Sequence, residues 1–145
     1  MTSATYATSK EAIHDFEKIG VLMILLYGSR AKNSHSPSSD YDISVLFESG
    51  KAAKTIAEYR NLMDLISSHF DIPLELMDIT LLNQSDSLLL CEILSSNKLL
   101  YGDIDFYLQW ECRTMFLHID NARLRELERA MVYRNMKYLN ENRSS

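Results

Sequence analysis

The chain has 145 residues, of which 46% are hydrophobic and 24% are charged, a balance typical of one globular domain with a buried core. Its formal net charge of −5 argues against a general nucleic-acid-binding protein, because such proteins neutralise phosphates with an excess of Lys and Arg. No apolar run approaches the ~20 residues of a membrane-spanning helix, and no N-terminal segment has the layout of a signal peptide, so we expect a soluble cytoplasmic protein.

The first part of the chain is predicted to contain one helix and two strands. Ser9 can cap a helix that ends at Gly20, because serine is favoured at the start of a helix and glycine at its end. Apolar runs at residues 22–27 and 43–47 predict two buried strands. The segment between them is polar, rich in serine and interrupted by Pro37, so it is expected to be a loop.

The middle of the chain is predicted to add a helix, a strand and two short elements. Residues 51–70 carry apolar side chains at three- and four-residue spacing, which is the pattern of an amphipathic helix. Pro73 precedes a predicted third strand at residues 74–79, since proline is tolerated at the start of a strand. A short helix is expected at residues 85–94 and an edge strand at residues 98–101. This order of elements predicts an α/β (α+β) fold with a small mixed sheet flanked by helices.

The last part of the chain is predicted to be helical. A long helix is expected from about residue 104 to residue 140, with a break or bend near residues 118–121. We expect a single domain over residues 1–145, with its core at about residues 10–102 and a C-terminal helical segment at about residues 104–140.

Two short polar motifs lie at the ends of the first two predicted strands. Gly28 and Ser29 follow the first strand, and Asp40 and Asp42 lie at the start of the second. Because successive strand residues point to opposite faces, the two carboxylates share one face. They repel each other unless a cation lies between them, and oxygen-only ligands suit Mg²⁺ that also binds substrate phosphates. Glycine allows the backbone to approach a phosphate closely, and a serine hydroxyl can donate to it.

A Gly28-Ser29 pair followed about ten residues later by Asp-x-Asp resembles the signature of the nucleotidyltransferase superfamily related to DNA polymerase β. Within it, the stretch is similar to the minimal nucleotidyltransferases (the MNT family), whose motif is approximately GSxARG…SDxDxxV. The Gly-Ser pair is followed here by Arg30 and Ala31, and then by Lys-Asn-Ser where family members carry Arg-Gly. The resemblance covers about residues 20–102 and implies a polymerase-β-like nucleotidyltransferase fold.

A third carboxylate is expected on the strand after Pro73, because a pair of metal ions needs more than two acidic ligands. Glu75 and Asp78 both lie there, on opposite faces of a regular strand. Family members have approximately vDlvDl in this place, and Glu75 falls on the first, catalytic Asp. The resemblance therefore assigns the third position to Glu75 in preference to Asp78, with a carboxylate about one methylene further from the backbone.

The resemblance implies an enzyme that transfers AMP from ATP to a hydroxyl acceptor with the help of two Mg²⁺ ions. Asp40, Asp42 and Glu75 would hold the ions, and Glu75 with the activating ion would draw the proton from the acceptor. The residues expected to bind the nucleotide are Gly28, Ser29 and Arg30.

The acceptor is also suggested only by the resemblance. Stand-alone MNT proteins resemble the antitoxins of HEPN–MNT toxin–antitoxin pairs, in which the MNT partner adds AMP to a tyrosine near the RNase site of the HEPN toxin. This implies a complex with a HEPN-type RNase encoded nearby. The net charge and the lack of a long apolar run separately predict that the protein binds neither nucleic acid nor membrane. The surface of residues 105–140 is expected to contact the toxin, and its aromatic residues Trp110, Phe116 and Tyr133 lie either there or in a solvated or core position.

Two alternatives to a protein adenylyltransferase are open. A catalytically weak antitoxin that acts by steric cover is favoured by the unusual Lys32-Asn33-Ser34 loop and by Glu75. A small-molecule nucleotidyltransferase, for instance one that acts on an aminoglycoside, normally has an acidic second half that holds a polycation. Residues 103–145 are instead mixed in charge.

Overall fold

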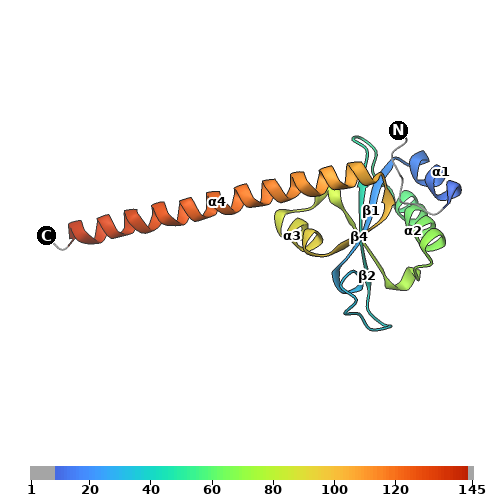
Figure 1. Cartoon of the computed structure of the whole chain (residues 1–145), viewed down its shortest axis with the longest axis horizontal. Helices are drawn as coiled ribbons and strands as arrows, with labels where there is room; N and C mark the ends of the chain where they lie inside the picture. Colours follow the sequence, from blue (N-terminus) through green and yellow to red (C-terminus); the bar gives the residue numbers. More distant parts are fainter. Residues whose placement is uncertain (1–8, 144–145) are drawn as a thin grey trace. The chain divides into compact units, whose positions relative to one another are not determined.

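The computed structural model describes residues 9–143, except for the side chains of residues 118–122 and 124 (Figure 1). Contacts between residues divide the chain into two compact units, one that ends at Glu111 and one that starts at Cys112. The first unit contains the sheet and every residue that the sequence places in a site. The second unit is helical.

A four-stranded mixed sheet forms the centre of the first unit and confirms the predicted α/β class. Its strands lie in the order β3 (Met77–Leu81), β2 (Tyr41–Phe47), β1 (Val21–Tyr27) and β4 (Asn97–Gly102). β1 is antiparallel to both β2 and β4, whereas β2 and β3 are parallel. A parallel pair needs a crossover connection, and α2 (Ile56–Phe70) provides it between β2 and β3.

Two helices cover one face of the sheet, which we call the α1/α2 face (Figure 1). α1 (Lys10–Lys18) begins where the Ser9 hydroxyl accepts a hydrogen bond from the backbone N–H of Ala12 at 3.1 Å. α2 begins with a capping box formed by Thr55 and Glu58. The core between these helices and the sheet includes Phe16, Ile24, Ile43, Val45, Leu62, Ile66 and Tyr101.

The opposite face of the sheet, the α3 face, is covered by α3 (Ser87–Ser95) and by the first turns of α4 (Ile104–Arg143). Its smaller core includes Met23, Leu25, Tyr27, Leu82 and Ile93. Trp110 is partly buried and packs against this cluster. The hydroxyl of Tyr107 donates to Oδ1 of Asn97, which ties the start of α4 to the start of β4.

The predicted third strand is wrong at its first residues. Residues 74–76 form a short 3₁₀ turn, η2, and β3 starts only at Met77. The turn starts at Pro73, whose carbonyl oxygen accepts a hydrogen bond from the backbone N–H of Leu76 at 3.2 Å. Glu75 therefore lies in the turn and not on the strand.

The final helix is continuous in its backbone over the 40 residues of α4, so the structure has no break in the helix at residues 118–121. All side chains of the second unit that the structure describes are exposed, apart from the half-exposed Thr114. Several of these exposed side chains are large and apolar, among them Phe116, Leu117, Leu127, Met131 and Tyr133. Within the described residues, no helix is long and apolar enough to cross a membrane.

Candidate active site

Gly28 lies at the end of β1 and faces the acidic motif of β2. Its φ of 72° is in the left-handed region, where glycine is favoured. A Cβ atom at this position would overlap Oδ2 of Asp42, and the neighbouring Tyr27 is the register partner of Asp42. Only a glycine thus allows the end of β1 to lie directly against the Asp42 carboxylate.

Asp42 and Asp78 lie side by side on parallel strands. The register of β2 and β3 pairs these two residues directly. The residue that follows Asp42, Ile43, packs in the core of the α1/α2 face, so Asp42 points to the α3 face, and Asp78 shares that face. Asp40 comes directly before β2 and is exposed.

The environment of Asp42 disfavours its ionised form. Burial is the main cause that raises the pKa of this carboxyl, and the nearby charges of Asp78, Glu92 and Asp40 raise it further, in that order. Glu92 projects from α3 and was not recognised from the sequence, where it is one charged residue in an otherwise apolar helix. The four carboxylates of Asp40, Asp42, Asp78 and Glu92 therefore form one acidic cluster.

Glu75 lies outside the group of charges that act on Asp42. It is exposed in the η2 turn, and it is absent from the charges that raise the pKa of Asp42. Asp78, which the sequence offered as the second choice for the third carboxylate, is the acid that lies in register with Asp42. The assignment of Glu75 as third carboxylate stays a prediction, with Asp78 as a rival that has the better position.

Tyr27 and Thr80 link the strands around the acidic cluster. The Tyr27 hydroxyl and Oγ1 of Thr80 are hydrogen-bonded at 3.1 Å, across the intervening strand β2. Burial raises the pKa of the Tyr27 phenol, the hydrogen bond to Thr80 lowers it, and the charges of Asp42 and Asp78 raise it again. The bond fixes β3 relative to β1, so it helps to hold Asp78 beside Asp42.

The carboxylates of the acidic cluster are suitable ligands for a divalent cation, although their side chains do not converge on one point. Within the described residues, no three His, Cys, Asp or Glu side chains converge as metal ligands. The carboxylates are hard oxygen donors of the kind that Mg²⁺ prefers. Their mutual repulsion, which raises the pKa of Asp42, is the type of destabilisation that a bound cation removes.

Arg30 connects the Gly-Ser turn to the loop before Asp40. Its Nη2 atom donates to the carbonyl oxygen of Ser39 at 2.9 Å and to that of Pro37 at 3.3 Å. Its guanidinium lies over the ring of Tyr41, with Cζ 3.9 Å from the ring centroid. These contacts give Arg30 a positioning role in the site. Its binding of a nucleotide, expected from the sequence, stays a prediction.

Comparison with known protein families identifies the class of this chain. The sequence profile of the family "Polymerase beta, Nucleotidyltransferase" matches residues 10–107, which are more than half of the chain. The chain therefore belongs to this nucleotidyltransferase family, and the resemblance found in the Gly-Ser and Asp-x-Asp motifs is confirmed. The matched residues contain the whole sheet and all the predicted site residues.

Solved structures of toxin–antitoxin complexes share the fold. A toxin–antitoxin with AMP-PNP is 21% identical, with a TM-score of 0.56 over 86% of this chain and 99% of the other. A mutant of the toxin–antitoxin MntA–HpeT is 20% identical, with a TM-score of 0.55 over 83% of this chain and 96% of the other. The tri-AMPylated HEPN toxin of Shewanella oneidensis in complex with an MNT antitoxin is 22% identical. Its TM-score is 0.50, over 83% of this chain and 93% of the other. The search of curated proteins found no match.

Arg30→Lys should lower the kcat of nucleotide transfer about tenfold to a hundredfold, because a lysine keeps the charge but has no planar guanidinium to stack on the ring of Tyr41 and so place the loop before Asp40. The KM for ATP should change little. Steady-state kinetics at varied ATP measures both constants. Lys32→Ala serves as a control for removal of a cation from the same loop. A higher KM for ATP with an unchanged kcat would instead make Arg30 a nucleotide-binding residue.

Proposed function

We propose that this chain is a protein adenylyltransferase that acts as the antitoxin of a HEPN–MNT pair. The observation that carries the proposal is the position of Asp42, held against Gly28 on one side and beside Asp78 on the other, in a chain of the nucleotidyltransferase family. The structural likeness to toxin–antitoxin complexes, one of them with an ATP analogue and one with an AMPylated toxin, supports this choice of acceptor.

The reaction joins an acceptor hydroxyl to the α-phosphorus of ATP. The oxygen of the hydroxyl attacks phosphorus, its proton leaves, and the bond to the pyrophosphate oxygen breaks, so that a phosphodiester and pyrophosphate form. Mg²⁺, when bound, supplies charge stabilisation to the phosphates and acidifies the attacking hydroxyl. The protein contributes positioning and electrostatics, which are the main terms in such a transfer.

The residues of the chain have separate tasks in this proposal. Asp40, Asp42 and Asp78 form the acidic side that would hold two Mg²⁺ ions, with Glu75 as the rival for the third place. Gly28 and Ser29 lie in the η1 turn (Gly28–Arg30) directly beside Asp42, where the backbone N–H groups and the serine hydroxyl can donate to phosphate oxygens.

The partner surface in this proposal is the helical second unit. Its exposed apolar side chains, which include Phe116, Leu127, Met131 and Tyr133, would otherwise remain in water. At the start of the predicted surface at residues 105–140, Phe106 and Leu108 are exposed, whereas Trp110 is partly buried against the first unit. We propose that the HEPN toxin covers the part that follows Glu111.

Intact mass spectrometry of the toxin tests the proposal. Incubation of a HEPN-type RNase encoded beside this chain with ATP, Mg²⁺ and this protein should add about 329 Da per AMP unit. The modified residue should be a tyrosine, and RNase activity should decline as the modified fraction rises. The control is the same incubation with the Asp42→Asn variant, which should leave the mass unchanged.

A binding antitoxin without catalysis is the second candidate. It is favoured by the departures from the family motif at Lys32-Asn33-Ser34 and at Glu75. In that case the toxin would be neutralised with no change in mass, and Asp42→Asn would neutralise it equally well.

A further inference from the structure

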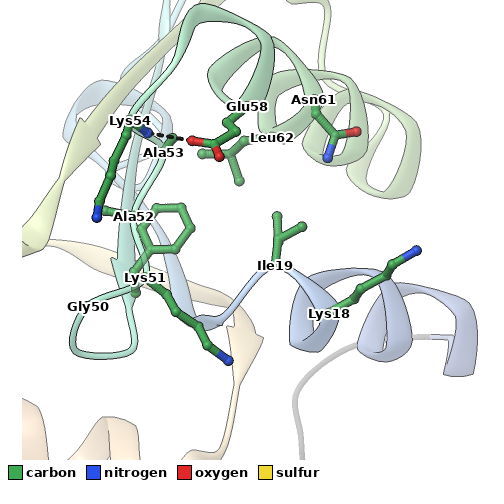
Figure 2. Close-up of a pocket in the computed structure, with 11 residues that line it drawn as sticks. Lys18, Ile19, Gly50, Lys51, Ala52, Ala53, Lys54, Glu58, Asn61 and Leu62 are labelled. Atoms are coloured by element: carbon green, nitrogen blue, oxygen red, sulfur yellow. Dashed lines mark hydrogen bonds between the residues drawn. The ribbon is translucent and has the colours of Figure 1, made fainter.

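A hollow of about 410 Å³ lies on the α1/α2 face, away from the acidic cluster (Figure 2). It is bounded by the end of α1, the loop after β2 and the first turns of α2. Its volume is within the range of about 300–1,000 Å³ that is usual for small-molecule sites. This hollow takes no part in the proposed nucleotide transfer.

The hollow is separated from the candidate active site by the length and the thickness of the sheet. Asp42 lies near the start of β2 and on the α3 face, whereas Phe47, which lines the hollow, ends the same strand on the other face. At about 3.3 Å per residue along a strand, the two residues are about 16 Å apart along the strand. One small ligand therefore cannot occupy both places.

The interior of the hollow is apolar. Ile19 and Leu62 point into it from opposite sides, as Figure 2 shows, and Phe47 contributes an aromatic ring. Phe47 and Leu62 are buried members of the core, and Ala52 and Ala53 add two small side chains that leave the space open. Such a lining suits a flat apolar group of a ligand.

The rim of the hollow is basic, in contrast to the net charge of −5 of the whole chain. Lys18, Lys51 and Lys54 line it from two different segments, and the ammonium groups of Lys18 and Lys54 lie on opposite sides of it and point outward (Figure 2). Lys51 pairs with Glu48 at 3.0 Å, but neither Lys18 nor Lys54 forms an ion pair with any residue that the structure describes. The pKa of Glu58 is lowered by the backbone hydrogen bonds from Lys54 and Thr55 and also by the charge of Lys54, so Lys54 already acts on a carboxylate.

Glu58, the one acidic residue that lines the hollow, already accepts hydrogen bonds from the backbone. Oε2 of Glu58 accepts hydrogen bonds from the backbone N–H groups of Lys54 at 2.7 Å and of Thr55 at 3.2 Å. This carboxylate completes the cap of α2, which begins at the edge of the hollow. The positive end of a helix of 15 residues adds to the attraction that the lysines exert on an anion.

We propose that this hollow binds a small organic anion with a flat apolar body, such as an aromatic carboxylate or a nucleoside monophosphate. The apolar body lies against Ile19, Phe47 and Leu62, and the anionic group lies at the rim, where Lys18 or Lys54 can turn toward it. The combination of an apolar floor with a lysine-lined rim selects this class of ligand over neutral or cationic molecules.

The probe for the test is 8-anilinonaphthalene-1-sulfonate, an aromatic anion whose fluorescence rises when it leaves water. Its neutral analogue, N-phenyl-1-naphthylamine, is titrated in parallel onto the full chain without ATP, Mg²⁺ or toxin, so the result does not depend on nucleotide transfer. In the double variant Lys18→Gln/Lys54→Gln, the affinity for the anionic probe should fall about fivefold to tenfold, because two exposed charge contacts are lost. The affinity for the neutral analogue should be unchanged.

The matched control is Lys10→Gln/Lys137→Gln, which removes the same charge from two lysines that do not line the hollow. This variant should bind both probes like the wild type. Equal weakening of the anionic probe in both double variants would show a general charge effect and overturn the proposal. So would equal affinity for that probe in the wild type and in Lys18→Gln/Lys54→Gln.

Competition then identifies the anion. AMP and indole-3-acetate are each titrated against the bound anionic probe, with adenosine and indole as neutral controls. Displacement by AMP alone indicates a phosphate-bearing ligand, and displacement by indole-3-acetate alone indicates a carboxylate. If neither acid displaces the probe at lower concentration than its neutral control, the hollow does not select organic anions and the proposal is wrong.

Discussion

Asp42→Asn should lower the rate of nucleotide transfer by about 10³-fold or more. The carboxylate of Asp42 is the acid held against Gly28 and beside Asp78, and its replacement removes a charge worth several kcal/mol to the transition state while it changes little volume. The rate is measured as AMP incorporated into the toxin or as pyrophosphate released. A variant that retains the wild-type rate would remove Asp42 from the catalytic centre.

The same variant should raise the stability of the metal-free protein at neutral pH. The pKa of Asp42 is raised in the folded state by burial and by its acidic neighbours, so the contribution of this group to stability is full at pH values below its unfolded pKa. That contribution is lost as the pH rises through the raised folded pKa. At neutral pH the wild type carries the resulting repulsion, and the neutral asparagine does not.

Thermal unfolding measures this effect apart from activity. Without Mg²⁺, Asp42→Asn should melt a few degrees above the wild type, and the difference should disappear in acid. Mg²⁺ should raise the Tm of the wild type and leave that of the variant nearly unchanged, because a ligand stabilises the state that binds it. An equal shift of both proteins with Mg²⁺ would show that Asp42 is not a ligand.

Asp78→Asn should cost about 10²- to 10³-fold in rate, whereas Glu75→Gln should stay within about threefold of the wild type. The two changes are chemically matched, since each removes one negative charge from an exposed acid. They differ in place: Asp78 is in register with Asp42, and Glu75 lies in the turn before β3.

Both variants are compared by kcat, by the Mg²⁺ concentration that gives half-maximal rate, and by Tm. The Asp78 variant should need more Mg²⁺ than the wild type while it remains folded. The opposite pattern, with a large loss for Glu75→Gln and a mild one for Asp78→Asn, would restore the assignment suggested by the family resemblance.

The sequence predicted the fold because its strongest local signals agree with the tertiary structure. Apolar runs ended by Gly28 and preceded by Asp40 place β1 and β2, and the periodic helix at residues 51–70 contains α2. The order of these elements was sufficient to predict a mixed sheet. The acidic motif was located for the same reason, since it lies within three residues of a strand end that apolar patterning makes clear.

The third carboxylate was harder to predict because it depends on pairing between strands distant in the chain. Local sequence gave no way to see that the Pro73 carbonyl closes a 3₁₀ turn, which delays the start of β3. The choice between Glu75 and Asp78 rests on that delay. Glu92 gave no signal at all, since only the packing of α3 on the sheet brings it near Asp42.

The parallel pairing of β2 with β3 has a consequence for the folding of the chain during its synthesis on the ribosome. Asp42 and Asp78 are separated in the chain by the whole of α2, and non-local pairings of this kind form late in folding because a long loop must close first. A nascent chain that ends before β3 has a Gly-Ser turn and one acidic strand, but no neighbouring pair of carboxylates. Cation binding should therefore appear only when residues through Leu81 have emerged and docked.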